Sequence, residues 1–471
     1  MRLGGNNSDG TVRFWQYHPI NMGDHTTTTV EMVKVESAKY ALDNDSTSLD
    51  RQSGCRSSDK IFEGFSGRIS TLRVIHRSFR KHEDTERGRR TGSVLIVSPG
   101  GLEQGGGIGR QMGYFLRGLD NSSNRLAYRV VDSRGPWFIG ASPLYSFGAV
   151  TYLGYAVLTL LLARCSLRPP LLHVNVTGRG STIRKVLLLT VARVLGLRYI
   201  LHVHDYDYAD YYKGRRPCFK RLIATAFQRA AAVIVLGRRD RAIISQMFEL
   251  PRGRVIMLHN AVPDPVPDIA RVRHLGQPCH LLFLGYLSVR KGVPELLQAL
   301  ASLPTTTRCW CATLVGGGPI DEFRKLAKNV GVVDKVSFLD WVDEAGIRAL
   351  CAHADVLVLP SHAEGLAMSI LEGMSHGLAV IATPVGAHSE VIEPEKSGLF
   401  VPPGDVPALA GAMARVIDDE SLRERLGRGG RERFLAEFDV RLYAARLTNL
   451  HARLLGSGRA EPEPIVEGYI P

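Results

Sequence analysis

The stretch PSHAEGLAMSILEGMSHG, residues 360–377, decides the fold class of this chain. It follows an apolar, β-branched run that ends at Leu359, passes through a short polar turn, and continues with helical spacing of apolar residues to Gly377. The pattern predicts the carboxyl end of a strand, a loop and the start of a helix. In open α/β sheets ligands bind at that edge, because helix N-termini point backbone N–H groups into the crevice.

Two carboxylates frame this turn. Glu364 lies in the expected loop and Glu372 in the expected helix, and helical rise puts their Cα atoms roughly 12 Å apart. A ligand with a sugar at one end and a ribose at the other matches that reach, with a phosphate between them at the helix N-terminus. On spacing alone, two solvated carboxylates at an ordinary helix start remain the alternative.

Similar strand and helix patterns run through most of the chain. Strands are expected at residues 94–98, 128–131, 171–176, 199–203, 232–236 and 255–258, and again at 281–285, 312–315, 336–342, 355–359 and 378–383. Strands that alternate with helices favour parallel, doubly wound sheets. The sequence therefore predicts two α/β units in tandem, separated by a proline-rich connector.

The predicted organisation has six parts. They are a poorly ordered basic extension over residues 1–92, a first α/β domain over 93–262, a proline-rich linker over 263–278, a second α/β domain over 279–436, a closing helix over 437–456 that carries Leu442, Leu447, Leu450 and Leu454, and a tail over 457–471.

Composition limits the function classes. The formal net charge of +13 favours an anionic partner such as a membrane surface or a phosphorylated substrate. No basic-aromatic recognition motif occurs, which disfavours nucleic acid. The seven cysteines form no CxxC pair, so a reducing cytoplasm is expected, with Cys309 and Cys311 as core thiols rather than metal ligands.

Residues 141–163 contain no charged side chain and are long enough to span a bilayer. Serine, proline, threonine and glycine residues weaken the segment as a span. We expect a buried or membrane-surface helix here instead.

Polar side chains follow one strand of the first unit. His202 and His204 share a face of the strand over 199–203 by alternation, and His204 is last before the loop. Asp205 and Asp207 follow. A substrate-facing histidine, an Asp-x-Asp metal site and a polar surface loop all remain possible at this point.

A second group of polar residues occurs in the second unit. Arg290 and Lys291 fall in the loop after its first strand, where two cations would neutralise a diphosphate. Glycines 316–318 follow the next strand. If these strands are parallel neighbours, both loops converge with Glu364 and Glu372 on one crevice.

Together these stretches resemble the retaining glycosyltransferases of family 4. The resemblance runs from Ser93 to about Leu455 and is carried by FLGYLSVRKGVPELLQAL, LVGGGP, DVLVLPSHAEGLAMSILEGMSHGLAVIATPVGAHSEVI and SGLFVPPGD. It implies the GT-B architecture, an α/β fold of two Rossmann-like domains with parallel sheets facing across a cleft. In that architecture the C-terminal helix packs back on the N-terminal domain.

The resemblance also implies roles for individual residues. Lys291 is expected to bind the diphosphate, Glu364 the donor-sugar hydroxyls, and Glu372 the ribose. His204 is expected near the reacting sugar, which makes His204, Lys291 and Glu364 the catalytic candidates. The other donor-binding candidates are Gly106, Gly107, Arg290, Val342, Gly365, Leu366 and Glu372, with backbone around Trp341 and Val342 at the base edge.

One position departs from the family. Tyr286 stands where an arginine is usual, so one phosphate-binding cation is missing. Arg290, from the same loop, is a candidate to replace it.

The implied reaction moves a hexose from a nucleotide diphosphate sugar to a hydroxyl of a glycan or lipid-linked acceptor, with retention, no cofactor and no metal. The expected setting is cell-surface or exopolysaccharide assembly, peripherally at the inner face of the cell membrane. Two alternatives remain: a metal-dependent Asp-x-Asp transferase, and a catalytically weak scaffold that binds nucleotide sugars.

Overall fold

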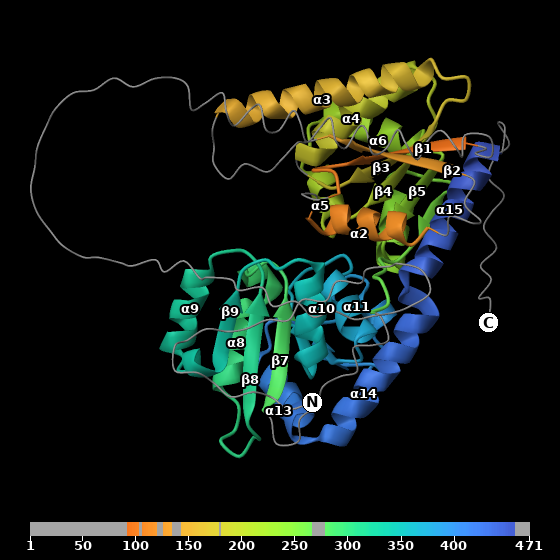
Figure 1. Cartoon of the computed structure of the whole chain (residues 1–471). Coiled ribbons are helices and arrows are strands. Elements are labelled where there is room, and N and C mark those ends of the chain that lie inside the picture. Colours follow the sequence, from red (N-terminus) through yellow and green to blue (C-terminus); the bar gives the residue numbers. More distant parts are fainter. Residues whose placement is uncertain are drawn as a thin grey trace, which may run out of the picture. The chain divides into compact units, whose positions relative to one another are not determined.

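Each half of the chain builds a sheet of six parallel strands, as the alternation of strands and helices predicts (Figure 1). The order is β2-β1-β3-β4-β5-β6 in the first sheet and β12-β11-β10-β7-β8-β9 in the second. The strands are β1 Gly92–Ser98, β2 Leu126–Asp132, β3 Leu171–Val176, β4 Tyr199–Val203, β5 Ala232–Val235, β6 Val255–Met257, β7 Cys279–Leu284, β8 Trp310–Val315, β9 Val336–Leu339, β10 Val356–Leu359, β11 Ala379–Ala382 and β12 Leu399–Phe400.

The computed structural model describes residues 92–102, 106–119, 126–133, 143–178, 180–265 and 278–456. All of them belong to one unit, His82–Pro471. We call residues 92–265 the first lobe and residues 278–433 the second lobe. The predicted extension over 1–92, most of the predicted linker over 263–278, and the tail over 457–471 lie outside the described residues.

Helices connect the strands in both lobes. They are α2 Gly106–Arg117, α3 Pro143–Arg164, α4 Gly180–Val194, α5 Tyr208–Lys213, α6 Pro217–Gln228, α7 Arg238–Met247, the 3-10 turn η1 Val289–Lys291, α8 Val293–Ala301, α9 Ile320–Asn329, the 3-10 turn η2 Val333–Lys335, α10 Glu344–His353, α11 Met368–Ser375, α12 His388–Val391, α13 Val406–Asp418, α14 Glu420–Arg433, the π-helical turn η3 Phe434–Phe438 and α15 Val440–Gly456.

Strand alternation sorts the first sheet into two apolar faces. Val94 and Ile96 of β1 belong to the cluster that also contains residues of α2 and α15. Leu95 and Val97, one residue out of phase, belong to the cluster beneath α3, α4 and α6. Both faces of this parallel sheet are therefore covered by helices.

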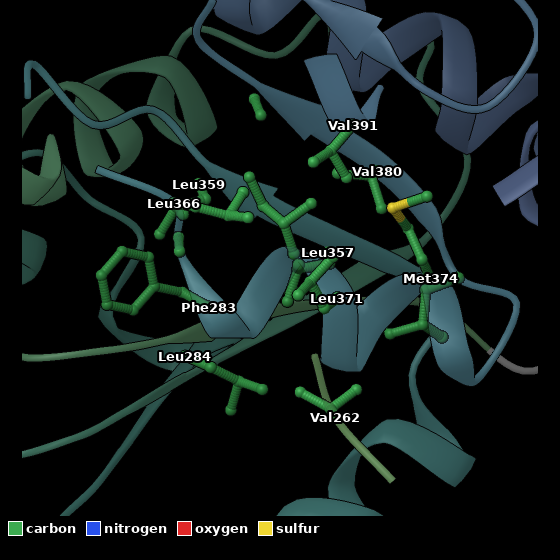
Figure 2. Packing of buried hydrophobic residues seen from close by; sticks show 14 of the residues in the cluster. Val262, Phe283, Leu284, Leu357, Leu359, Leu366, Leu371, Met374, Val380 and Val391 are labelled. Carbon is green, nitrogen blue, oxygen red and sulfur yellow. The ribbon is translucent and has the colours of Figure 1, made fainter. Parts of the chain in front are cut away.

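In the second lobe, helix α11, which lies in the stretch over residues 360–377, packs on the preceding strand β10. Figure 2 shows Leu357 of β10 beside Leu371 of α11 in the apolar core. Gly373 makes this approach possible, because a Cβ there would stand 2.9 Å from Leu357 Cδ2. The close packing fixes the start of α11 against the carboxyl end of β10.

The closing helix α15 returns to the first lobe, where it contacts β1, β3 and α2. Leu447, Leu450 and Leu454 are buried there, which confirms the predicted packing of the C-terminal helix on the N-terminal domain. Leu442 is exposed, so its assignment to the core was wrong. It lies in the first turn of α15.

Gly106 and Gly107 lie in the first turn of α2. Two local expectations need correction. Strand β9 stops at Leu339, which leaves Trp341 and Val342 in a loop. Cys309 is exposed and Cys311 half-buried, because β8 begins only at Trp310.

The apolar segment over 141–163 contributes α3, which is buried on one side only, through Ala156 and Leu160. Among the residues that the structure describes, no helix is both long and apolar enough to cross a membrane.

Candidate active site

A cavity of about 500 Å³ is lined by loops that follow strands of both sheets. In the second sheet the strand order reverses between β7 and β10, and the loops after these two strands carry Lys291 and Glu364. Ligands of open α/β sheets bind at such a switch point. The cavity brings together every residue predicted for the site: Gly106, Gly107, His204, Arg290, Lys291, Val342, Glu364, Gly365, Leu366 and Glu372.

The loop after β7 presents two cations to one carboxylate. Gly292 has φ 73° and a Cβ there would stand 2.1 Å from the carbonyl oxygen of Pro360, so only glycine lets the two loops come this close. The approach places Lys291 Nζ 2.7 Å from Glu364 Oε1. Arg290 Nη1 lies 2.7 Å from the same oxygen.

This pairing sets the charge of Glu364. Burial alone would raise its pKa, but the Lys291 ammonium and the Arg290 guanidinium together lower the pKa of Glu364 below its ordinary value. The carboxylate is therefore ionised at neutral pH and holds both cations at the cavity wall.

The loop after β10 is held from beneath by the segment after β11. A Cβ on Gly386, whose φ is 57°, would stand 2.1 Å from the Glu364 carbonyl oxygen. The Ala387 N–H donates to the Gly365 carbonyl at 2.7 Å. His388 Nδ1 contacts the Thr383 carbonyl at 3.0 Å, and its Nε2 accepts from the Ala367 N–H at 3.4 Å. Burial lowers the pKa of His388 to about 4, so the ring is neutral and carries its proton on Nδ1.

Glu372 pairs with a residue of the first lobe. Arg110 Nη1 of α2 lies 3.0 Å from Glu372 Oε1. Glu372 is 5% exposed, and burial raises its pKa above the ordinary value even though Arg110 opposes the shift. One carboxylate oxygen thus binds an arginine, and the other is left for a ligand.

His204 is fixed by a buried amide. Its Nε2 lies 2.8 Å from Oδ1 of Asn175. The Nδ2 of the same amide donates to the Val97 carbonyl at 3.4 Å. An amide oxygen only accepts, so Nε2 of His204 carries the proton. Burial lowers the pKa of His204 to about 3, which leaves Nδ1 with a free lone pair.

A row of buried imidazoles continues from His204 into the first lobe. The His202 ring lies beside that of His204, with centroids 4.0 Å apart and planes tilted by 32°, on the same strand face as alternation predicts. His202 Nδ1 lies 3.2 Å from His173 Nε2, and His173 Nδ1 lies 3.1 Å from His451 Nε2 on α15. Burial lowers the pKa of all four histidines, so the row is neutral.

Sequence reasoning missed Arg110, Asn175 and His388 as parts of the site. Nothing in the sequence around Arg110 marks its partner Glu372, which lies 262 residues away. Asn175 is the penultimate residue of the buried strand β3, and a polar side chain at that position was the available signal. His388 begins α12 and carries no such signal.

The aspartates after β4 differ from one another. Asp205 lines the cavity, accepts from the Gly178 N–H, and has a pKa of about 6, raised by burial and by its contact with Asp207. Asp207 does not line the cavity. Within the described ranges there is no group of three or more histidine, cysteine or acidic side chains that could hold a metal ion.

Aromatic side chains line the mouth of the cavity. Tyr286 is 52% exposed and Trp341 55% exposed, and both line it. Tyr206 of the first lobe lies under the Arg290 guanidinium, 5.1 Å from its ring centre. Tyr286 supplies no charge, so the two cations after β7 are Arg290 and Lys291 alone.

Comparison with known proteins shows that part of the chain matches a described family. Residues 269–433 match the family described as glycosyl transferases group 1. The chain is 26% identical over 298 residues to alpha-D-kanosaminyltransferase of Streptomyces kanamyceticus, covering 60% of this chain and 77% of that protein. It is 32% identical over 197 residues to a GDP-mannose-dependent phosphatidylinositol monomannoside mannosyltransferase of Mycobacterium tuberculosis, covering 40% of this chain and 51% of the relative. The chain thus spans about half the length of that relative.

Solved structures share the fold. Sucrose-phosphate synthase of Thermosynechococcus elongatus superposes with a TM-score of 0.62 at 22% identity, over 78% of this chain and 100% of that one. Anabaena HepE, in complex with UDP and glucose, superposes with a TM-score of 0.60 at 17% identity, over 77% and 100%. Residues 269–433 therefore match the group 1 glycosyl transferases, and the chain has the two-domain GT-B fold of these solved structures.

Proposed function

We propose that this chain is a retaining, metal-independent transferase of family 4. It moves a hexose from a nucleoside diphosphate sugar to a hydroxyl of a glycan or lipid-linked acceptor, in the assembly of a cell-surface or exported polysaccharide. The mannosyltransferase relative is named for a GDP-mannose donor and a lipid acceptor, and the HepE structure holds UDP and glucose, which supports both halves of the proposal.

One observation carries the proposal. Lys291 and Arg290 converge on the buried Glu364 at the switch point of the second sheet, in the cavity that also holds Glu372. Two fixed cations suit a diphosphate, whose negative charge grows as the bond to the sugar breaks. Glu364 holds both cations in position before the donor arrives, so little reorganisation accompanies the reaction.

The proposed step balances without an enzyme nucleophile. The bond from the sugar C1 to the phosphate oxygen breaks, and the acceptor oxygen bonds to C1 from the same face. The acceptor proton passes to the leaving phosphate, and nucleoside diphosphate and the glycoside are the products. Lys291 and Arg290 stabilise the departing charge.

Groups of both lobes bind the donor and the acceptor for this step. His204, with Nδ1 free, accepts a hydrogen bond from a hydroxyl of the donor sugar or the acceptor without adding positive charge. Glu372 accepts from the ribose hydroxyls through the oxygen that Arg110 leaves free. Glu364 binds donor-sugar hydroxyls beside the backbone N–H groups of Gly365 and Leu366.

The metal-dependent alternative uses Asp205 and Asp207. Asp205 accepts a backbone N–H from Gly178, which already occupies one of its oxygens. Chelator treatment decides: unchanged turnover supports the metal-independent proposal, and turnover that is abolished by the chelator and restored by manganese overturns it.

The scaffold alternative rests on Tyr286, which stands exposed at the cavity where the family usually has an arginine. It predicts donor binding without hydrolysis or transfer. Release of nucleoside diphosphate from a bound donor rejects it.

A thermal-shift screen of UDP-, GDP- and ADP-sugars tests the proposal. One donor is expected to raise the melting temperature through mass action and then to be turned over with retained anomeric configuration, read by NMR. Lys291→Ala and Glu364→Ala should each abolish turnover. Lys185→Ala is the matched control, since Lys185 is also buried but does not line the cavity. Equal turnover in Lys291→Ala and the wild type would refute the assignment.

A further inference from the structure

Helix α3 presents apolar side chains to solvent. Tyr155 is 60% exposed, Leu158 52% and Leu162 65%, whereas Ala156 and Leu160 face the sheet and are buried. A helix on the surface of a water-soluble protein normally turns polar residues outward. This one is apolar on both sides, so its outer side lacks the usual polar cover.

The neighbouring helix α4 repeats the feature. Ile183, Leu187 and Val194 are at least half exposed and share one outward stripe, by their spacing of four and seven residues. Leu188 and Ala192 lie on the opposite, buried side. The two helices contact each other, and α3 lies along the outer side of the first lobe next to α4 (Figure 1).

We call the exposed apolar residues of these two contacting helices the α3–α4 surface. Its members are Tyr152, Tyr155, Leu158, Leu161, Leu162, Ile183, Leu187 and Val194. Single exposed leucines are ordinary in soluble proteins, but a cluster on two adjoining helices marks an interaction site.

Charge identifies the partner. No aspartate or glutamate occurs between Asp132 and Asp205, whereas eight arginines and lysines fall in that interval. The last turn of each helix carries a basic residue, Arg164 in α3 and Arg193 in α4, and both side chains are exposed. An apolar surface with a basic border and no acidic residue is complementary to anionic lipid headgroups above acyl chains.

A second copy of the chain fits the same surface poorly. A two-fold dimer through the α3–α4 surface would bring the same basic border from each copy together, and like charges in contact repel. A bilayer avoids this repulsion because its headgroups carry the opposite sign.

We propose that the α3–α4 surface docks on an anionic lipid bilayer, with the helices lying in the interface rather than crossing it. The inference rests on the proposed function, because docking on a bilayer would bring the cavity to an acceptor that is linked to a lipid. Its test needs no turnover, so the two can fail separately.

Vesicle co-sedimentation of the full chain is the test. Vesicles of phosphatidylglycerol with phosphatidylcholine should bind the wild type, and vesicles of phosphatidylcholine alone should bind it much less. The triple variant Leu158→Glu, Leu161→Glu, Leu162→Glu should reduce binding to the anionic vesicles by about tenfold or more, since it removes three apolar insertions and adds negative charge.

Leu435→Glu is the matched control, because Leu435 is 43% exposed against 44% for Leu161 and lies on η3 outside this surface. It should bind vesicles as the wild type does. Leu162→Glu and Ile183→Glu, made singly on separate helices, decide the question if the triple variant fails to fold. Arg164→Glu with Arg193→Glu should reduce the preference for phosphatidylglycerol.

Three results would overturn the proposal. The first is that the wild type does not bind anionic vesicles. The second is that the Leu162→Glu and Ile183→Glu variants bind these vesicles as well as the wild type does. The third is that the wild type is a dimer and that these substitutions dissociate it without changing vesicle binding. Melting-temperature shifts with UDP- and GDP-sugars, measured on the same variants, report the donor site independently. They should equal those of the wild type.

Discussion

The two walls of the cavity manage buried titratable groups in opposite ways. On the second-lobe wall, Glu364 keeps its charge because Lys291 and Arg290 pair with it. On the first-lobe wall, His204 and the imidazoles behind it are buried and neutral. A buried charge is stable only with a partner, whereas a neutral ring needs only packing and hydrogen bonds. The comparison teaches that one cavity can pair fixed charges on one wall with oriented neutral rings on the other.

The largest effect is expected from removing a charge on the second-lobe wall. Lys291→Met should lower kcat by about 100-fold to 1000-fold, because the leaving diphosphate loses a preorganised cation. It should also reduce the free energy of unfolding by about 2 kcal/mol, since Glu364 keeps only Arg290 as a partner.

Adding Glu364→Gln to Lys291→Met sharpens the comparison. The double variant should regain stability relative to Lys291→Met, because the carboxylate that had lost one of its two cations is replaced by a neutral amide, yet its turnover should stay low. Urea unfolding and initial rates measure the two effects. A double variant whose stability losses simply add would contradict the charge-pairing account.

Two arginines of α2 offer the next test. Arg110 pairs with Glu372, whose side chain is 7% exposed, and Arg117 pairs with Glu344, whose side chain is 34% exposed. Arg110→Ala should cost about 3 kcal/mol of unfolding free energy because it strands a buried carboxylate. Arg117→Ala, the control two turns along the same helix, should cost about 0.5 kcal/mol or less. Equal losses in denaturant unfolding would remove the distinction between the two pairs.

A smaller effect is expected on the neutral wall. Asn175→Ala should lower kcat by about tenfold, since His204 loses the hydrogen bond that fixes its ring and tautomer. Asn175→Asp should instead place a carboxylate on His204 Nε2 and raise the imidazole pKa. The rate of the Asn175→Asp variant should then fall with acid between pH 8 and 5, a range in which the wild-type rate does not fall. An unaltered profile would mean that Asn175 is only a packing residue.

The smallest effect concerns acid stability. The pKa of His173 is lowered in the folded state, so below about pH 6.5 the unfolded chain binds a proton that the folded chain does not. The contribution of this histidine is fully present above pH 6.5 and falls by about 1 kcal/mol between pH 6.5 and 5.5.

His173→Phe isolates this contribution, because the ring volume stays while the titrating group is lost. Wild-type stability should fall more steeply with acid than that of the variant. Subtracting the two curves removes the opposing contribution of Asp205, whose pKa of about 6 adds stability as the pH falls. Parallel curves from pH 7 to 5.5 would show that His173 does not titrate on unfolding.

Features that depend on strand ends could be predicted from the sequence. The loops after β7 and β10 meet because parallel strands end at one edge, and this brought Lys291 and Glu364 together in the prediction. The helical start after Leu359 was visible in the apolar spacing, and α11 begins at Met368. These signals are local or follow from sheet topology.

Contacts between distant segments could not be predicted. The Arg110–Glu372 pair depends on how α2 of the first lobe meets α11, and His451 joins the histidine row only because α15 returns to the first sheet. The sequence around Arg110 or His451 does not show whether the side chain is buried or which residue it contacts. For α3 the sequence left a buried helix and a membrane-surface helix as alternatives, because an apolar sequence does not reveal which neighbours are absent.

Calorimetric titration of UDP, GDP and ADP into the wild type and Lys291→Met tests the central claim most directly. The account predicts that one nucleoside diphosphate binds the wild type and binds Lys291→Met at least about tenfold more weakly, while Arg117→Ala binds it as the wild type does. Equal affinity for that nucleotide in the wild type and Lys291→Met would contradict the account.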